Sequence, residues 1–191
     1  MASTTSAQIL IYVLRRDLRY TDNPVLSEIQ KSFESGTAGF THLLPIYVFP
    51  SHQIEVSGFI PLDDSGSPVA RSPYPEARSE VARFWRCGPH RAKFLAESVW
   101  DLKNTLEQQN SRLTIRVGKI TDVLNSIFEH LDGLDVSGKE PSSSKPRVTN
   151  VWMTNDYGFE EQQELDAVQA AVEKAGAQFR HFIDEKYYVH E

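Results

Sequence analysis

The chain of 191 residues has a single cysteine, no long apolar run and no excess of basic residues. One cysteine excludes an intrachain disulfide and a multi-cysteine metal site. No apolar run approaches the length of a bilayer span, so no membrane segment is expected. A net charge of −6 excludes a general attraction to nucleic acid or to an anionic membrane. These features fit an intracellular protein, with nucleus, cytoplasm and mitochondrion all left open.

Several well-known motifs are also missing. The first apolar run is followed by RRDLR rather than G-x-G-x-x-G, so the usual dinucleotide phosphate cradle is absent. There is no P-loop and no G-x-S-x-G elbow, and the six histidines show no metal-ligand spacing. Cys87 has cationic neighbours that could activate a thiolate. An unreactive loop cysteine is the better interpretation, because no resolving cysteine or positioned acid accompanies it.

The sequence does contain a regular alternation of apolar runs and amphipathic segments. Strands are predicted at 9–14, 43–49, 113–117, 148–154 and 179–183, and helices at 24–35, 93–106, 120–131 and from 159 to a stop at Gly176. The first two strands are continuously apolar, which is typical of a parallel sheet covered on both faces. Pro45 is expected at the start of its strand or at a bulge.

This order predicts an α/β fold: a five-stranded doubly wound parallel sheet, Rossmann-like, with helices on both faces and one long irregular insertion. One domain is expected over residues 9–191, after a flexible leader at 1–8. Repeated prolines forbid a long helix between 51 and 90, which makes this stretch the irregular insertion. Residues 135–147 are poor in apolar side chains and predict a disordered surface insertion.

The stretch 9–26 reads as a strand, a charged turn and a helix. Asp22 or Asn23 can cap the helix, and Pro24 fits its first turn. Ligands of open α/β sheets bind beyond the carboxyl ends of the strands, which makes residues 15–23 a candidate rim of a site. The alternative is a solvated turn whose arginines form salt bridges.

Two further stretches carry candidate chemistry. Between residues 71 and 93, six basic residues and several aromatic residues outnumber two acids, a mixture that can bind phosphates and stack on flat rings. The alternative is a packed insertion whose arginines pair with local acids. In FEEQQELD, Glu160 or Glu161 could accept hydrogen bonds from a bound heterocycle, whereas the simpler interpretation is that acids suit a helix N-terminus.

Two of these stretches resemble a known family. RRDLRYTDNPVL is similar to the opening of photolyases and cryptochromes, in which R-x-D-L-R-x-x-D-N-x-x-L follows the first strand. Residues 72–107 resemble DASH-type cryptochromes, in which F-x-x-C-G-x-x-R-x-x-F-L-x-E-S-V-x-D-L recurs. The resemblance covers the whole chain apart from the leader and the insertion at 135–147.

The resemblance implies the N-terminal α/β antenna domain of a DASH-type cryptochrome. In that family a linker and a larger helical domain follow, which binds FAD and DNA. Light absorbed by the reduced flavin drives repair of cyclobutane pyrimidine dimers, for DASH members mainly in single-stranded DNA, and some members are blue-light receptors. Many members carry methenyltetrahydrofolate as a light-harvesting antenna.

Because the chain stops where that linker should begin, the FAD-binding helical domain is expected to be absent. No catalytic residue, FAD site, DNA binding or photorepair is then expected of this chain alone. The resemblance places Glu161 at the acid that meets the pterin, with Glu160 less secure because other members have Asn there. Weak binding of methenyltetrahydrofolate is expected. Two alternatives stay open: an interaction or regulatory module without a chromophore, and a stand-alone nucleotide-binding protein, against which the missing glycine-rich cradle counts.

Overall fold

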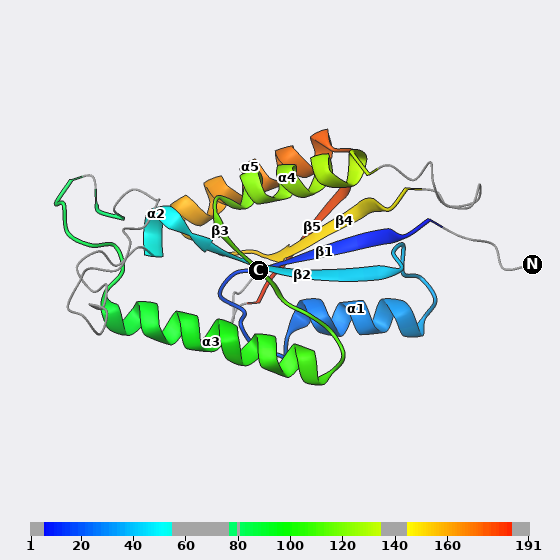
Figure 1. Ribbon diagram of the computed structural model, residues 1–191, viewed down its shortest axis with the longest axis horizontal. Helices are drawn as coiled ribbons and strands as arrows, with labels where there is room; N and C mark the ends of the chain where they lie inside the picture. The colour runs from blue at the N-terminus through cyan, green and yellow to red at the C-terminus, as the bar shows by residue number, and fades with distance from the viewer. Residues whose placement is uncertain (1–5, 55–76, 80, 135–144, 185–191) are drawn as a thin grey trace, which may run out of the picture.

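A five-stranded parallel sheet runs through the centre of the computed structural model, which describes residues 6–54, 77–79, 81–134 and 145–184. In the order β3-β2-β1-β4-β5 the strands are β1 (Gln8–Leu14), β2 (His42–Pro50), β3 (Thr114–Gly118), β4 (Arg147–Thr154) and β5 (Gln178–Phe182). Helices α1 (Pro24–Glu34) and α3 (Pro89–Gln108) cover one face, and α4 (Ile120–Asp132) and α5 (Phe159–Lys174) cover the other (Figure 1). A short helix, α2 (Ser51–Ile54), follows β2. The predicted doubly wound sheet is confirmed.

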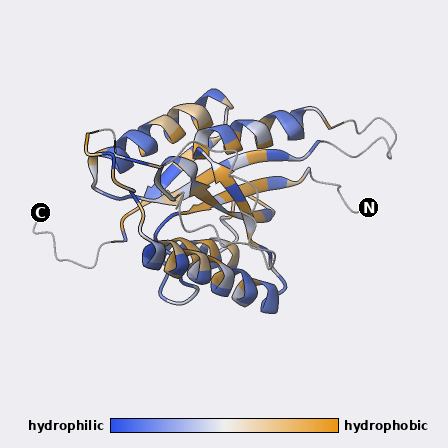
Figure 2. Ribbon diagram, turned by 60° about the vertical axis from the view of Figure 1, so that its left-hand side comes forward, coloured by the Kyte–Doolittle hydropathy of each residue, from blue (hydrophilic) through white to orange (hydrophobic). Residues whose placement is uncertain are grey.

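Each face of the sheet has its own hydrophobic core. Along β1, Leu10 and Tyr12 pack in the core beneath α1 and α3, whereas Ile11 and Val13 pack in the core beneath α4 and α5. Successive side chains of a strand point to opposite faces, so burial on both faces requires a continuous apolar run. Figure 2 shows this as hydrophobic strands between helices whose outer faces are hydrophilic.

Two boundary expectations need correction. The first strand begins at Gln8, a residue that the sequence assigned to the leader, and the backbone of Arg147 donates to the Ala7 carbonyl at 2.9 Å. Pro45 lies inside β2, neither at its start nor at a bulge, and pairs with Tyr12 of β1. Pairing of β2 with β3 begins only at Ile46, so the missing amide of Pro45 costs no hydrogen bond to β3.

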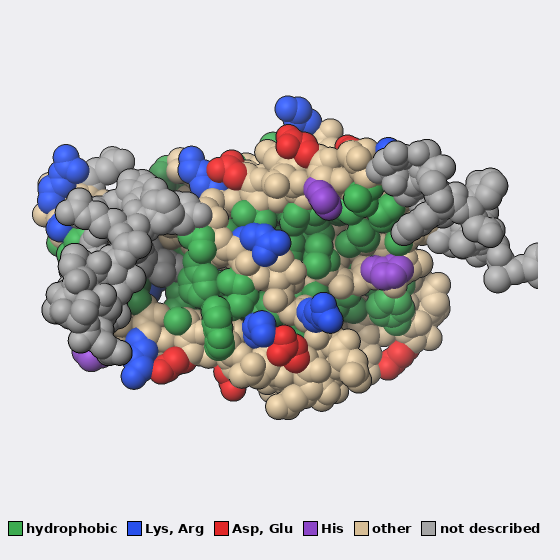
Figure 3. Space-filling view, viewed as in Figure 1, with side chains coloured by type: hydrophobic (Ala, Val, Ile, Leu, Met, Phe, Trp, Pro, Cys, Tyr) green, Lys and Arg blue, Asp and Glu red, His purple; other side chains and the backbone are tan. Residues whose placement is uncertain are grey.

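The helices match the predicted apolar stripes closely. The helix expected from Lys93 begins earlier, at Pro89, and it buries Val99, Leu102 and Leu106 as the spacing predicted. Most of the irregular stretch at 51–90, and residues 135–144 of the second insertion, lie outside the described residues. No helix within the described ranges is long and apolar enough to cross a membrane. In Figure 3, hydrophobic side chains gather between the two helical layers.

A buried polar network joins β1 to the turn after it and to the start of α1. The Tyr12 hydroxyl donates to the Asp17 carboxylate, whose other oxygen accepts the Arg15 amide at 2.8 Å. The Asn23 amide donates to the Tyr12 oxygen at 2.8 Å, and its carbonyl caps α1 by accepting the amides of Val25 and Leu26 at 3.0 Å. Asp17 and Asn23 are almost completely buried. Burial, followed by the charge of Asp17, raises the pKa of Tyr12.

We expect Asn23→Ala to lower the free energy of unfolding by roughly 2 kcal/mol, because it removes the helix cap and leaves buried polar groups unpaired. Urea denaturation of both proteins measures this difference. The matched control is Asn104→Ala on the exposed face of α3, where the change should stay within about 0.5 kcal/mol. Equal losses at the two positions would contradict a special role for the network.

Candidate functional site

A cavity of about 820 Å³ opens at the carboxyl ends of the strands. We call it the strand-end cavity. Its walls come from the turn after β1, the end of β2, the first turns of α3 and α4, and the first turns of α5. Open α/β sheets bind ligands at this edge, and the volume lies in the usual range for small-molecule sites. Of the candidate rim at 15–23, the residues Arg15, Arg16, Leu18 and Arg19 line this cavity.

Arginines from the charged turn meet acids from α5 across this cavity. Arg15 pairs with Glu164 at 2.8 Å. Arg16 pairs with Glu161 and also with Asp156 at 2.8 Å. The arginines of the turn thus form the salt bridges that one interpretation predicted, and these salt bridges border the cavity. That the turn forms the rim of a ligand site stays a prediction.

Glu161 is both an acid in the first turn of α5 and a residue of the cavity wall. Gly158 is the N-cap of α5, and Glu161 is the third residue of the helix, a position that favours an acid. Its carboxylate folds back so closely that a Cβ at Gly158 would collide with it. Its side chain is 17% exposed and lines the cavity. The preference of a helix N-terminus for acids therefore accounts for its position, and the ion pair with Arg16 holds it at the cavity wall.

Glu160 turns the other way, toward the segment before α3. It pairs with Arg86, and this contact, followed by the charge of Arg86, lowers the pKa of the Glu160 carboxyl. In the same segment Arg78 lies over the Trp85 ring, 3.7 Å from its centroid. Arg86 therefore has an acidic partner, but this acid comes from α5 and is not one of the local acids that the packed interpretation predicted. Residues 71–76 and 80 lie outside the described residues.

Sequence reasoning did not identify Tyr47 and Phe94 of the cavity wall, whereas Arg91 belongs to the basic stretch at 71–93. Tyr47 at the end of β2 is almost completely buried, and burial raises its pKa to about 12, so it stays a neutral phenol. Phe94 is largely exposed, and Arg91 has no ion partner within the described residues. The signal shared by Tyr47 and Phe94 was position alone, at the end of a buried strand and in the first turns of a helix.

The structure also bears on the reactivity of Cys87 and on metal binding. Cys87 is buried, and burial raises the pKa of its thiol more than nearby Arg91 lowers it. This favours the unreactive interpretation. Across the described ranges, no group of three or more His, Cys, Asp or Glu side chains could hold a metal ion.

Comparison with known proteins decides the family. Residues 10–137 match the sequence family described as DNA photolyase. The chain belongs to the DNA photolyase family. Within it, the chain is 43% identical to a putative cryptochrome DASH of Gibberella zeae over 182 residues, 95% of this chain and 23% of that protein. It is 42% identical to a putative mitochondrial cryptochrome DASH of Neurospora crassa over 185 residues, 97% of this chain and 22% of that protein.

The chain thus spans less than a quarter of these photolyase-family relatives and matches their N-terminal region. Solved structures show the same fold at low identity. A cryptochrome of Synechocystis superposes with a TM-score of 0.60 at 15% identity, covering 94% of this chain and 28% of that one. An archaeal photolyase of Sulfolobus tokodaii, described with two FAD molecules, superposes with a TM-score of 0.56 at 17% identity, covering 93% and 29%.

The Arg86–Glu160 pair predicts a stability difference that depends on pH. A lowered pKa means that the pair stabilises the fold above the ordinary glutamate pKa of about 4.3, and that this contribution disappears as pH falls through the folded value. Glu160→Gln should therefore be less stable than wild type near pH 7, by no more than about 1 kcal/mol since the pair is exposed. The two proteins should converge in acid.

Urea denaturation at several pH values measures this difference. Glu129→Gln is the control, because Glu129 lies exposed on α4 without an ion partner in the described part of the chain. A Glu160 difference that persists unchanged at pH 3 would show that the ion pair is not its cause.

Proposed function

We propose that this chain is the light-harvesting α/β domain of a DASH-type cryptochrome, with an antenna chromophore in the strand-end cavity. The observation that carries the proposal is the cavity itself, placed at the ligand-binding edge of the sheet in a member of the DNA photolyase family. In the longer protein, the FAD-binding helical domain and single-stranded DNA containing pyrimidine dimers would be its partners.

Methenyltetrahydrofolate is the proposed chromophore, with Glu161 as its principal contact. A carboxylate accepts the paired amino and ring N–H donors of a pterin well. If the Glu161 carboxylate turned from Arg16 to the pterin, Arg16 would keep Asp156 as its partner at 2.8 Å. Glu160 is the weaker candidate, since its carboxylate points toward Arg86.

FAD is a second candidate for the same cavity. The Sulfolobus photolyase is described with two FAD molecules and with the implication of a novel light-harvesting cofactor. Here Arg91 offers a guanidinium at the cavity wall, a good partner for a phosphate. The folate and the flavin can be compared in one set of titrations.

The alternative function is an interaction module without a chromophore. Large apolar side chains are exposed around the carboxyl ends of the strands: Phe94, Tyr157, Phe159 and Ile183. Exposed apolar clusters commonly mark protein–protein contacts. In the light-harvesting proposal the same side chains would face the helical domain.

We expect the purified chain to bind methenyltetrahydrofolate weakly, and Glu161→Gln to bind it at least about tenfold more weakly, because a charge-assisted hydrogen bond is typically worth roughly 1.5–3 kcal/mol. Near-ultraviolet absorbance during titration measures both affinities, and parallel titrations use FAD. Gly158→Ala should also weaken binding, since the added methyl group displaces the Glu161 carboxylate.

Glu173→Gln, exposed in the last turn of α5, is the matched control and should bind like wild type. Equal folate affinity in wild type and Glu161→Gln would remove Glu161 from the site. If a folded wild-type chain bound neither the folate nor FAD, the light-harvesting proposal for this chain would fail and the interaction module would be favoured.

A further inference from the structure

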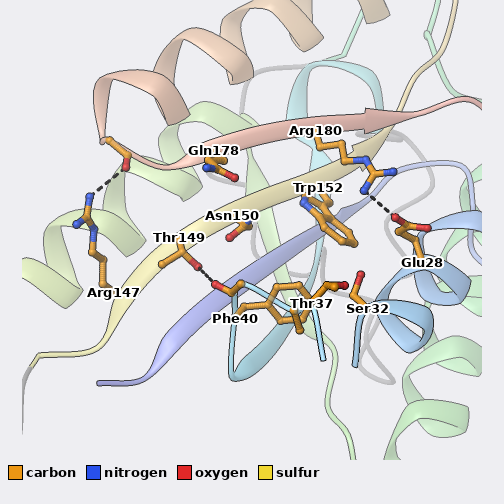
Figure 4. Close-up of a pocket in the computed structure, with 13 residues that line it drawn as sticks. Glu28, Ser32, Thr37, Phe40, Arg147, Thr149, Asn150, Trp152, Gln178 and Arg180 are labelled. Carbon is orange, nitrogen blue, oxygen red and sulfur yellow. Dashed lines mark hydrogen bonds and ion pairs between the residues drawn. The ribbon is translucent and has the colours of Figure 1, made fainter. Parts of the chain in front are cut away.

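A second cavity, of about 570 Å³, lies away from the strand ends, over β4 and β5 on the face of the sheet that carries α1 (Figure 4). We call it the β4–β5 cavity. It shares no lining residue with the strand-end cavity. Its walls come from α1, the loop before β2, and the two strands. The proposed light-harvesting function makes no use of it.

An irregularity in β4 shapes this cavity. The register of β4 against β1 shifts between Ile9 and Leu10, so that Val148 pairs with Ile9 while Asn150 pairs with Leu10. The extra residue, Thr149, donates weakly to the Gly39 carbonyl at 3.3 Å. Such bulges re-aim side chains. Val148 packs in the core beneath α4 and α5, while Thr149 and Asn150 both line the cavity.

Two side-chain amides lie next to each other in the β4–β5 cavity. Asn150 of β4 pairs in register with Gln178 of β5, and Trp152 pairs with Arg180 one step further along. Neither amide, nor the Trp152 indole N–H, has a hydrogen-bond partner within the described residues. The only buried side-chain nitrogen or oxygen without a partner there belongs to Arg15. The free groups of Asn150 and Trp152 must therefore be accessible, and the cavity is where they meet solvent (Figure 4).

Charge is distributed unevenly along the cavity. At one end the Arg180 guanidinium already has partners, because it pairs with Glu28 at 2.8 Å and lies over the rings of Trp152 and Phe182. At the other end Arg147 donates one N–H to the Gly176 carbonyl at 3.0 Å. Its remaining donors have no carboxylate partner in the described part of the chain. This end of the cavity is thus open to an anion.

We propose that the β4–β5 cavity binds an adenine mononucleotide. Asn and Gln side chains recognise the amino group and ring nitrogen of adenine through two hydrogen bonds, and Asn150 and Gln178 offer such amides together. Arg147 is suited to the phosphate, since a guanidinium matches phosphate oxygens. The three residues from Arg147 to Asn150 span roughly 10 Å of strand, a separation that base, ribose and phosphate can bridge. The cavity is of ordinary size for a small ligand.

Calorimetric titration of the whole chain with adenosine 5′-monophosphate tests the proposal. We expect one nucleotide per chain, with weaker binding of adenosine, which lacks the phosphate, and of ribose 5-phosphate, which lacks the base. Gln178→Met keeps the side-chain length and removes the amide, so it should weaken nucleotide binding about tenfold. Arg147→Gln should reduce the affinity for the nucleotide to that for adenosine.

Two control variants test whether binding is specific to the β4–β5 cavity. Gln108→Met makes the same change on the exposed end of α3 and should bind the nucleotide like wild type. Glu161→Gln alters only the strand-end cavity and should also leave nucleotide binding unchanged. The proposal is overturned if the folded chain shows no binding at millimolar nucleotide, if Gln178→Met binds as tightly as wild type, or if ribose 5-phosphate binds as tightly as the nucleotide.

Discussion

The buried hydrogen bonds among Tyr12, Asp17 and Asn23 are the constraint on which the ligand-binding edge of this molecule depends. They place the Asp17 carboxylate inside the protein without a cation partner among the described residues, which is tolerable because its oxygens accept a hydroxyl and a backbone amide. They also anchor the start of α1. The turn between β1 and α1 is therefore a fixed structure rather than a loose surface loop.

With Asp17 held inward, the arginines of the turn pair with acids from distant parts of the chain. Arg15 and Arg16 meet α5, and Arg19 meets Asp184 after β5 at 2.7 Å. These pairs hold the turn after β1 against the start of α5 and against the segment after β5. Individually, exposed ion pairs contribute little free energy. Their effect is to fix the positions of the charged side chains around the strand-end cavity. Those positions decide which polar atoms of a ligand the cavity can bind.

The strand-end cavity and the β4–β5 cavity follow from different features of the sheet. The strand-end cavity exists because β1, β2 and β3 end together, so that their following loops and helices surround a common space. The β4–β5 cavity exists because α1 and α3 leave part of the sheet uncovered and because a bulge turns Thr149 and Asn150 to the same side. The two sites can therefore be altered independently.

The sequence by itself determined the architecture. Strands buried on both faces require continuous apolar runs, and helices buried on one face require apolar residues with a period of about 3.6 residues. It also determined the cap of α1 to within one residue and the family of the chain. It misplaced Pro45, because a proline is tolerated inside a strand where no neighbouring strand needs its missing amide. The sequence does not show that β3 begins to pair with β2 only at Ile46. Only the tertiary structure decided that Glu161 meets Arg16 and that Glu160 meets Arg86, since these partners are 145 and 74 residues apart in sequence. Ion pairs between residues so far apart leave no pattern in the local sequence, because they form only when the parallel strands bring their carboxyl ends to one edge of the sheet.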